Sequence, residues 1–237
     1  MHTEHRCFGP PGTGKTTWLA EQIEKAAGKF GGSNVIASSF TRAAATELIS
    51  RDLPVPAQNV GTLHALCFRV LGRPKLATGK IVEEFVEAFP QWRLSKSSSS
   101  LDEPWRERGK EQASGEREME RSEILRSRMV PVERWPALTA SFHRDWTTWK
   151  ASAGLMDFTE LIETALRECP VAPGGPAVGF VDEVQDLTPL QLALVRSWAM
   201  EMVHVVLCGD DDQCIYRWVG ATPDAFLDPP LAVMGGV

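Results

Sequence analysis

The sequence predicts an α/β fold, in which a parallel central sheet is flanked by helices on both faces and interrupted by an inserted, mainly helical subdomain. Towards both ends of the chain, short apolar runs alternate with helical patterns, and a glycine-rich turn follows the first run. Strands that alternate with helices pair in parallel, because each helix returns the chain to the same end of the sheet. The middle of the chain has few β-branched residues and many charges, which is typical of helices.

The first part of the chain shows a β-α-β-α pattern. It predicts a short strand before residue 9, a helix over about 15–27, a strand over 34–39 and a helix over about 42–49.

The last part of the chain continues the same pattern. It predicts a helix over 158–168, a strand over 178–182, a helix over 189–200 and a strand over 204–208. The α/β domain is therefore expected to be discontinuous, with residues 1–74 and 151–237 on one sheet. Residues 75–150 form the helical insertion, and we expect a mobile, charged segment around residues 95–123.

Composition narrows the class of protein. The 237 residues are 43% hydrophobic, which is enough for a sizeable core, and no run approaches 18 consecutive apolar residues. The first residues also lack the apolar core of a signal peptide, so we expect a cytoplasmic protein with no membrane partner. The five cysteines are scattered and odd in number, which disfavours a disulfide framework or a zinc site and favours buried thiols. With a net charge of −6, any contact with nucleic acid is expected to be local.

A phosphate-binding loop is the most specific motif. Residues 9–16 read GPPGTGKT and fit the pattern G-x-x-x-x-G-K-[ST]. The glycines let backbone N–H groups converge on phosphate oxygens, and the next helix points its positive end at them. Lys15 would reach the β- and γ-phosphates and Thr16 would ligate Mg²⁺, so the predicted cofactors are Mg²⁺ and ATP or another NTP. The predicted nucleotide-binding residues here are Gly9, Pro10, Pro11, Gly12, Thr13, Gly14, Lys15, Thr16 and Thr17.

Acidic and amide side chains follow two of the later strands. Asp182 and Glu183 end the apolar run VGFV, and Gln213 lies in LCGDDDQ after the next run. An Asp-Glu pair alone is also typical of a solvated strand end, but ligands of parallel sheets bind at the carboxyl ends of the strands, where the phosphate loop lies too. We therefore expect Asp182 to hold Mg²⁺ with Thr16, and Glu183 to polarise the attacking water. The predicted catalytic residues are Lys15, Glu183 and Gln213. The amide of Gln213 would sense the γ-phosphate.

Six motifs in order make the chain similar to a known family. The chain resembles the first RecA-like domain of UvrD/Rep-type superfamily 1 DNA helicases over nearly its whole length, more weakly over 75–150. The matching stretches are GPPGTGKT, SFTRAAATEL (39–48), GTLHALCFRVL (61–71), MDFTEL (156–161), VDEVQD (181–186) and GDDDQCIYRWVGA (209–221). The resemblance implies a RecA-like P-loop NTPase that binds DNA, single-stranded or branched.

The resemblance also implies a DNA-facing surface. Its predicted residues are Ser39, Phe40, Thr41, His64, Tyr216 and Trp218. Aromatic side chains there would stack on bases, each stacked base being worth about 1–3 kcal/mol. Core packing for Phe40 and Trp218, and a structural role for His64, remain alternatives.

The chain departs from the family at several positions. Val219 stands where the family has an arginine that contacts the γ-phosphate, and Ala43 replaces a lysine, although Arg42 beside it supplies charge for the nucleotide. Only eight residues precede Gly9, so the adenine-recognition glutamine of the family is not found and loose nucleotide selectivity is expected. After residue 221 too few residues follow for a second RecA-like domain, which in such helicases supplies an arginine finger worth about 10³–10⁵ in rate. We expect a second copy or a partner protein to supply it.

Three hypotheses follow. The first is a DNA-dependent NTPase that acts in recombination, repair or replication as an oligomer or with a partner. The second is a DNA-binding module in which the nucleotide acts as a switch. The third is an NTP-linked nuclease or junction-remodelling factor, although no separate carboxylate cluster indicates a nuclease site.

Overall fold

The computed structural model describes residues 3–9, 13–78, 80–94 and 114–210. The chain divides into two compact units, of which the first contains residues 1–72 and 162–237 and the second contains residues 73–161. The sequence prediction placed the insertion at 75–150.

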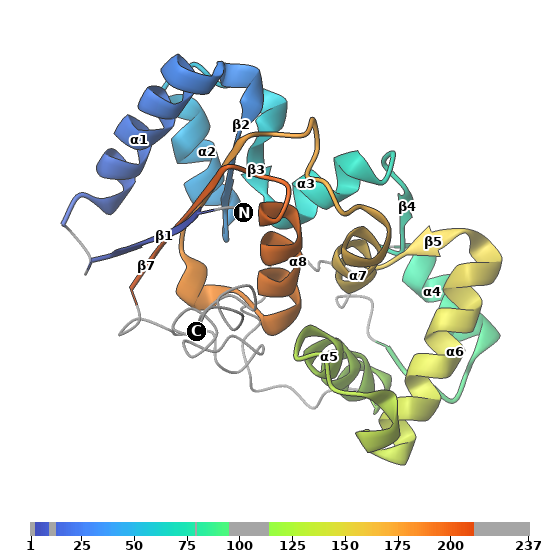
Figure 1. Cartoon of the computed structure of the whole chain (residues 1–237). Helices are drawn as coiled ribbons and strands as arrows, with labels where there is room; N and C mark the ends of the chain where they lie inside the picture. The colour runs from blue at the N-terminus through green and yellow to red at the C-terminus, as the bar shows by residue number, and fades with distance from the viewer. Residues whose placement is uncertain (1–2, 10–12, 79, 95–113, 211–237) are drawn as a thin grey trace. The chain divides into compact units, whose positions relative to one another are not determined.

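A five-stranded parallel sheet forms the centre of the first unit (Figure 1). Its strand order is β1-β7-β6-β2-β3, so β7 separates the first strand from β6. The strands are β1 (Thr3–Phe8), β2 (Val35–Ser39), β3 (Val60–Thr62), β6 (Val178–Val181) and β7 (His204–Gly209). Because all neighbours are parallel, the carboxyl ends of these strands meet at one edge.

Helices cover both faces of this sheet (Figure 1). On one face, alternate residues of β2, β6 and β7 pack with Leu19 and Ile23 of α1 (Lys15–Phe30) and Leu48 of α2 (Arg42–Ser50). The residues between them point to the other face, towards α3 (Leu63–Val70) and α8 (Pro189–Ala199). The buried strands therefore have apolar side chains on both faces, as parallel sheets require.

Short polar caps fix where the helices begin. Thr41 and Thr62 accept hydrogen bonds from the backbone N–H groups of Ala44 and Ala65, at 3.1 and 3.2 Å, and so start α2 and α3. Thr188 and Gln191 form a reciprocal capping box at the start of α8. The single-turn helices are η1 (Gly32–Asn34), η2 (Ala57–Asn59), η3 (Val132–Arg134) and η4 (Val184–Asp186).

The second unit is mainly helical. It contains α4 (Lys80–Ala88), α5 (Ser114–Ser127) and α6 (Ala137–Ala153), and α7 (Phe158–Glu168) begins in it. Its core is aromatic, with the Phe85 ring packed edge-to-face against Phe142 and Trp146 at centroid distances of 5.8 and 4.9 Å.

A buried ion network joins three helical segments of the second unit. Asp157 accepts hydrogen bonds from Arg126 at 2.8 and 3.1 Å and from Lys150 at 2.6 Å, and the Trp146 indole N–H donates to it at 3.0 Å. Burial disfavours the ionised carboxylate, but Arg126 and Lys150 together lower the pKa of Asp157 well below its usual range. Lys150 also donates to Glu160, so this cation is compensated twice.

Two expectations about the insertion need correction. No strand was expected between 75 and 150, yet β4 (Lys75–Leu76) pairs in parallel with β5 (Leu155–Met156). Residues 114–123 of the charged tract, expected to be mobile, belong to α5, where Glu118 accepts from Thr139 at 2.5 Å and Met119 is buried. Burial against α6 orders this part of the tract; residues 95–113 lie outside the described ranges.

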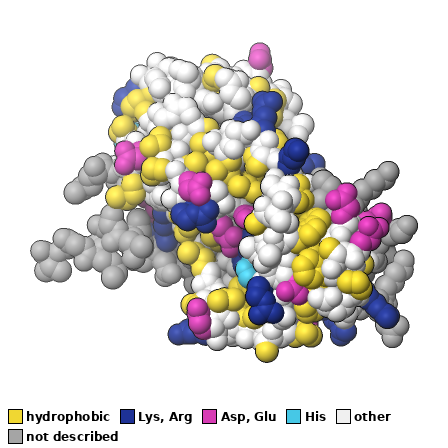
Figure 2. Space-filling model, turned by 90° about the vertical axis from the view of Figure 1, so that its right-hand side faces the viewer, with side chains coloured by type: hydrophobic (Ala, Val, Ile, Leu, Met, Phe, Trp, Pro, Cys, Tyr) yellow, Lys and Arg dark blue, Asp and Glu magenta, His cyan; other side chains and the backbone are white. Residues whose placement is uncertain are grey.

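The surface carries charges of both signs. On the face shown in Figure 2, basic and acidic side chains lie in small groups among hydrophobic and uncharged ones. No helix in the described part of the chain combines the length and the apolar character needed to cross a bilayer.

Candidate functional site

The phosphate loop joins β1 to α1 at the carboxyl edge of the sheet. Gly9 directly follows β1, and its N–H donates to the carbonyl of Gly209 at the end of β7, at 3.3 Å. Gly14 caps α1 with φ = 84°, a left-handed conformation that glycine adopts without strain. The 16-residue helix thus begins right after the loop, with its positive end directed at this edge. Pro10, Pro11 and Gly12 lie outside the described residues.

Lys15 and Gly9 are in direct contact across the loop. The Lys15 ammonium donates a hydrogen bond to the Gly9 carbonyl. A Cβ atom at residue 9 would lie 3.0 Å from the Thr13 hydroxyl oxygen and 3.1 Å from Cγ of Lys15, closer than side chains normally approach. A side chain at this position would therefore have to displace the side chains of Thr13 and Lys15. Thr16 is half-buried, whereas Thr13 and Thr17 are exposed.

The acidic pair follows β6, two strands away from β1. Asp182 is 2% exposed, and its backbone N–H donates to the Ser38 carbonyl on β2 at 2.8 Å. Its carboxylate accepts from the backbone N–H of Glu183 at 3.0 Å. Glu183 is half-buried and has φ = 56°, an uncommon conformation for a residue with a side chain.

The electrostatics connect Asp182 with the phosphate loop. Burial, and then the charge of Glu183, raise the pKa of Asp182 to about 6, while its bond from the Glu183 backbone and the charge of Lys15 act in the opposite direction. Glu47 on α2 also raises this pKa. Lys15, Asp182 and Glu183, predicted from motifs more than 160 residues apart, therefore influence one another in the fold.

Two further residues of the site were not predicted individually. Gln185 and Asp186 are buried on η4, and the Gln185 side chain bonds to Glu183, to Asp186 and to the backbone of Asp210 after β7. Burial, and then Glu183, raise the pKa of Asp186 to about 7. The sequence signal was the complete VDEVQD motif, of which only the first acidic pair had been given a role.

The donor set is suited to Mg²⁺. A threonine hydroxyl after the loop and a buried carboxylate at the end of β6 are hard oxygen ligands, and Mg²⁺ completes its shell with phosphate oxygens and water. Within the described ranges, no three His, Cys, Asp or Glu side chains group as a metal site. Thr16 and Asp182 would supply two protein oxygens, and a nucleotide-bound Mg²⁺ usually takes only a few protein ligands.

The predicted DNA-facing residues lie at the ends of β2 and β3. These strands pair so that Ser39 is opposite Thr62, which brings Phe40, Thr41 and His64 to the same edge of the sheet. Ser39 is buried, Phe40 and His64 are half-buried, and the Thr41 hydroxyl already caps α2. Arg42, expected near the nucleotide, is exposed at the first position of α2. Gln213, Tyr216 and Trp218 lie outside the described residues.

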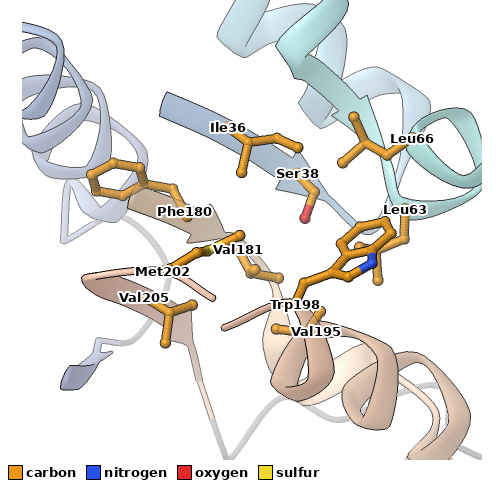
Figure 3. Close-up of a pocket in the computed structure, with 11 residues that line it drawn as sticks. Ile36, Ser38, Leu63, Leu66, Phe180, Val181, Val195, Trp198, Met202 and Val205 are labelled. Carbon is orange, nitrogen blue, oxygen red and sulfur yellow. The ribbon is translucent and has the colours of Figure 1, made fainter. Parts of the chain in front are cut away.

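An apolar pocket lies elsewhere in the first unit (Figure 3). Leu63 and Leu66 of α3 and Trp198 of α8 line it, and Ser38 provides a hydroxyl in its lining. Aliphatic side chains line most of it, and none of the predicted nucleotide or metal ligands does. This pocket is a packing feature between the sheet and its second helical layer.

The fold and the loop first define a class. A parallel sheet flanked by helices, with a phosphate loop after β1 and an Asp-Glu pair after β6, is a RecA-like P-loop NTPase fold. The family model described as AAA domain matches residues 3–219, so the chain belongs to this family. Within it, the chain is similar to the N-terminal part of UvrD-type superfamily 1 helicases.

Individual relatives support this placement. The chain is 27% identical over 254 residues to ATP-dependent DNA helicase UvrD2 of Mycobacterium tuberculosis, covering 92% of this chain and 35% of that protein. It is 31% identical over 239 residues to DNA helicase II of Salmonella typhimurium, covering 89% of this chain and 32% of that protein. DNA helicase II of Escherichia coli is 30% identical over the same length. The chain thus spans about a third of the length of these relatives.

Proposed function

We propose that the chain binds and hydrolyses ATP or another NTP with Mg²⁺ and couples this reaction to DNA. One observation carries the proposal: the phosphate loop after β1 and the Asp-Glu pair after β6 lie on the same edge of one sheet, where Lys15 and Asp182 interact electrostatically. The helicase relatives support the choice of reaction and of DNA as partner.

Each residue has a separate task in this proposal. The loop N–H groups and Lys15 bind the phosphates, and Thr16 and Asp182 would hold Mg²⁺, which neutralises charge on the phosphate oxygens when bound. Glu183 orients the attacking water and accepts its proton at the carboxylate. Gln213 senses the γ-phosphate, and Arg42 adds positive charge near the nucleotide.

We further propose that DNA, single-stranded or branched, lies along Ser39, Phe40, Thr41, His64, Tyr216 and Trp218. An arginine finger from a second copy or a partner protein would complete the site, in line with the role of such arginines in phosphoryl transfer. The biological setting would be DNA recombination, repair or replication.

The test is the NTPase rate as a function of protein concentration, with and without single-stranded DNA, combined with the molar mass from light scattering. Lys15→Ala should abolish hydrolysis, and Glu183→Gln should keep nucleotide binding while turnover falls by about a hundredfold or more. Wild-type activity in either variant would refute the site. Tight nucleotide binding without turnover at any concentration would instead indicate a nucleotide switch.

A further inference from the structure

The Gln185 side chain connects the ends of two neighbouring strands. It is 2% exposed and lies on η4, directly after β6. Its amide nitrogen donates to the Glu183 carboxylate at 2.5 Å and, more weakly, to the Asp186 carboxylate at 3.5 Å. Its amide oxygen accepts from the backbone N–H of Asp210, the residue that follows β7, at 2.9 Å.

The chemistry of the partners fixes the orientation of this amide. The two carboxylates accept hydrogen bonds, and the Asp210 backbone N–H can only donate one. A flipped amide would place its oxygen against the carboxylates and its NH₂ group against the N–H donor. The Gln185 amide can therefore form hydrogen bonds with the carboxylates and with the Asp210 N–H in one orientation only. A buried amide held in this way restrains the groups that it bonds.

Glu183 needs such support. Its backbone lies in the left-handed region at φ = 56°, and η4, which follows it, contains the apolar Val184 and the buried Gln185 and Asp186. A carboxylate that orients water must be held close to its working position, since displacement by about 1 Å can cost about a hundredfold in rate. The bond from Gln185 provides this restraint and leaves the second carboxylate oxygen for other contacts.

We propose that Gln185 is a positioning residue, which holds the Glu183 carboxylate in place by anchoring it to the backbone at the end of β7. The inference rests on the proposed function, because it assigns Glu183 the task of orienting water. Gln185 touches neither nucleotide nor water in this scheme and acts through Glu183. A shift of the backbone at Asp210 would consequently move the carboxylate.

The chain offers a matched control. Gln191 is also buried and also bonds a backbone N–H, but it serves the capping box of α8. Gln185→Leu and Gln191→Leu therefore remove the same group from a similar environment. In the full chain, Gln185→Leu should lower kcat for ATP hydrolysis by about tenfold to a hundredfold. Its Kd for a fluorescent ATP analogue should stay within about twofold of wild type, whereas Gln191→Leu should lower the Tm and leave kcat within about twofold.

A double-mutant cycle tests whether Gln185 acts through Glu183. In the Glu183→Gln background, Gln185→Leu should cause no further loss of kcat. An additional tenfold loss there would overturn the positioning role. A readout independent of turnover is amide hydrogen exchange at Asp210, which Gln185→Leu should accelerate and Gln191→Leu should not. Unchanged exchange at Asp210 would overturn the anchor.

The outcomes separate this inference from the proposed function. If wild type hydrolyses ATP, Glu183→Gln does not, and Gln185→Leu retains the wild-type kcat, the positioning role is wrong and the site stands. If wild type does not hydrolyse ATP, or if Glu183→Gln hydrolyses it as fast as wild type, the proposed function fails and the inference fails with it.

Discussion

Replacing Asp182 by asparagine should stabilise the folded chain at neutral and alkaline pH while removing the proposed metal ligand. Burial and Glu183 raise the pKa of this carboxyl from 3.8 to about 6. That rise corresponds to about 3 kcal/mol by which the folded state disfavours the ionised form. Asparagine is neutral and keeps the oxygen that accepts the Glu183 backbone N–H. We expect a gain of about 1–3 kcal/mol in the free energy of unfolding at pH 8, because asparagine loses some of the carboxylate's interaction with Lys15.

The pH dependence has a definite sign. The folded pKa lies above the unfolded one, so the protonated carboxyl contributes stability that is fully present below about pH 4. As the pH rises through about 6, wild type loses this contribution, and asparagine does not. The advantage of Asp182→Asn should therefore be largest at pH 8 and vanish near pH 4.

Urea unfolding followed by tryptophan fluorescence, at pH 8, 6 and 4.5, measures this difference. Asp52→Asn is the control, because Asp52 is exposed and its left-handed backbone, with φ = 52°, suits asparagine; it should change stability little at any pH. Equal destabilisation by Asp182→Asn at pH 8 and 4.5 would refute the reasoning, since lost contacts rather than a buried charge would then dominate. Binding of the Mg²⁺–ATP complex by this variant should be weakened at every pH.

Asp157→Asn should have the opposite effect and destabilise the chain by about 3–5 kcal/mol at pH 7, because the buried Arg126 loses its counter-charge and the buried Lys150 keeps only that of Glu160. Since ion pairing lowers the pKa of Asp157, the loss should shrink as the pH falls below about 4, and urea unfolding with no such pH trend would contradict the network. Gly9→Ala should weaken ATP binding about tenfold through the close contacts of a new Cβ, measured by titration; unchanged affinity would mean that the loop adapts. Thr188→Ala should cost about 1 kcal/mol of stability by removing a capping box and leave nucleotide affinity unchanged, which unfolding and titration together check.

The α/β part of the fold could largely be predicted because its elements are long and regularly patterned. The helix expected over 158–168 is observed as α7 with the same bounds, and the strand expected over 178–182 is β6. β3 was not predicted: it has three residues with Gly61 in the middle, and only its pairing with β2 makes it a strand. Three residues are too few to show the alternation of a strand, and pairing with a neighbouring strand leaves no mark in the local sequence.

The helical unit shows a different limit. The start of α5 reads SGEREMERSE, which carries almost no apolar face, so its pattern alone predicts a solvated segment. Two polar contacts, from Thr139 to Glu118 and from Arg126 to Asp157, bury charged side chains of this helix. Interactions between residues 21 and 31 positions apart decide the structure here, and no local periodicity encodes them.

In the candidate site, the motifs predict charged residues but not the contacts between them. The motifs predict Lys15, Asp182 and Glu183, because phosphate chemistry requires a lysine after the phosphate loop and carboxylates at a strand end. The hydrogen bond between the Gln185 side chain and the Asp210 backbone joins residues 25 positions apart, and the motif alone predicts no role for Gln185. Such links depend on the strand order, in which β7 lies beside β6.

Asp157 and Asp182 are both buried, but the charge of Asp157 stabilises the fold, whereas that of Asp182 is suited to binding a cation. Asp157 is surrounded by cations of the chain itself, which lower its pKa and make its charge stabilising. Asp182 is as deeply buried, yet its strongest charged neighbour is Glu183, and the Lys15 ammonium that opposes this effect donates its hydrogen bond to Gly9 instead. Its ionised form is therefore costly in the folded chain, and a divalent cation would relieve that cost. The free energy that the ionised Asp182 costs the folded chain is recovered when a cation binds, so it adds to the affinity for the cation. The Asp182→Asn variant has no such cost and should therefore lose this part of the affinity.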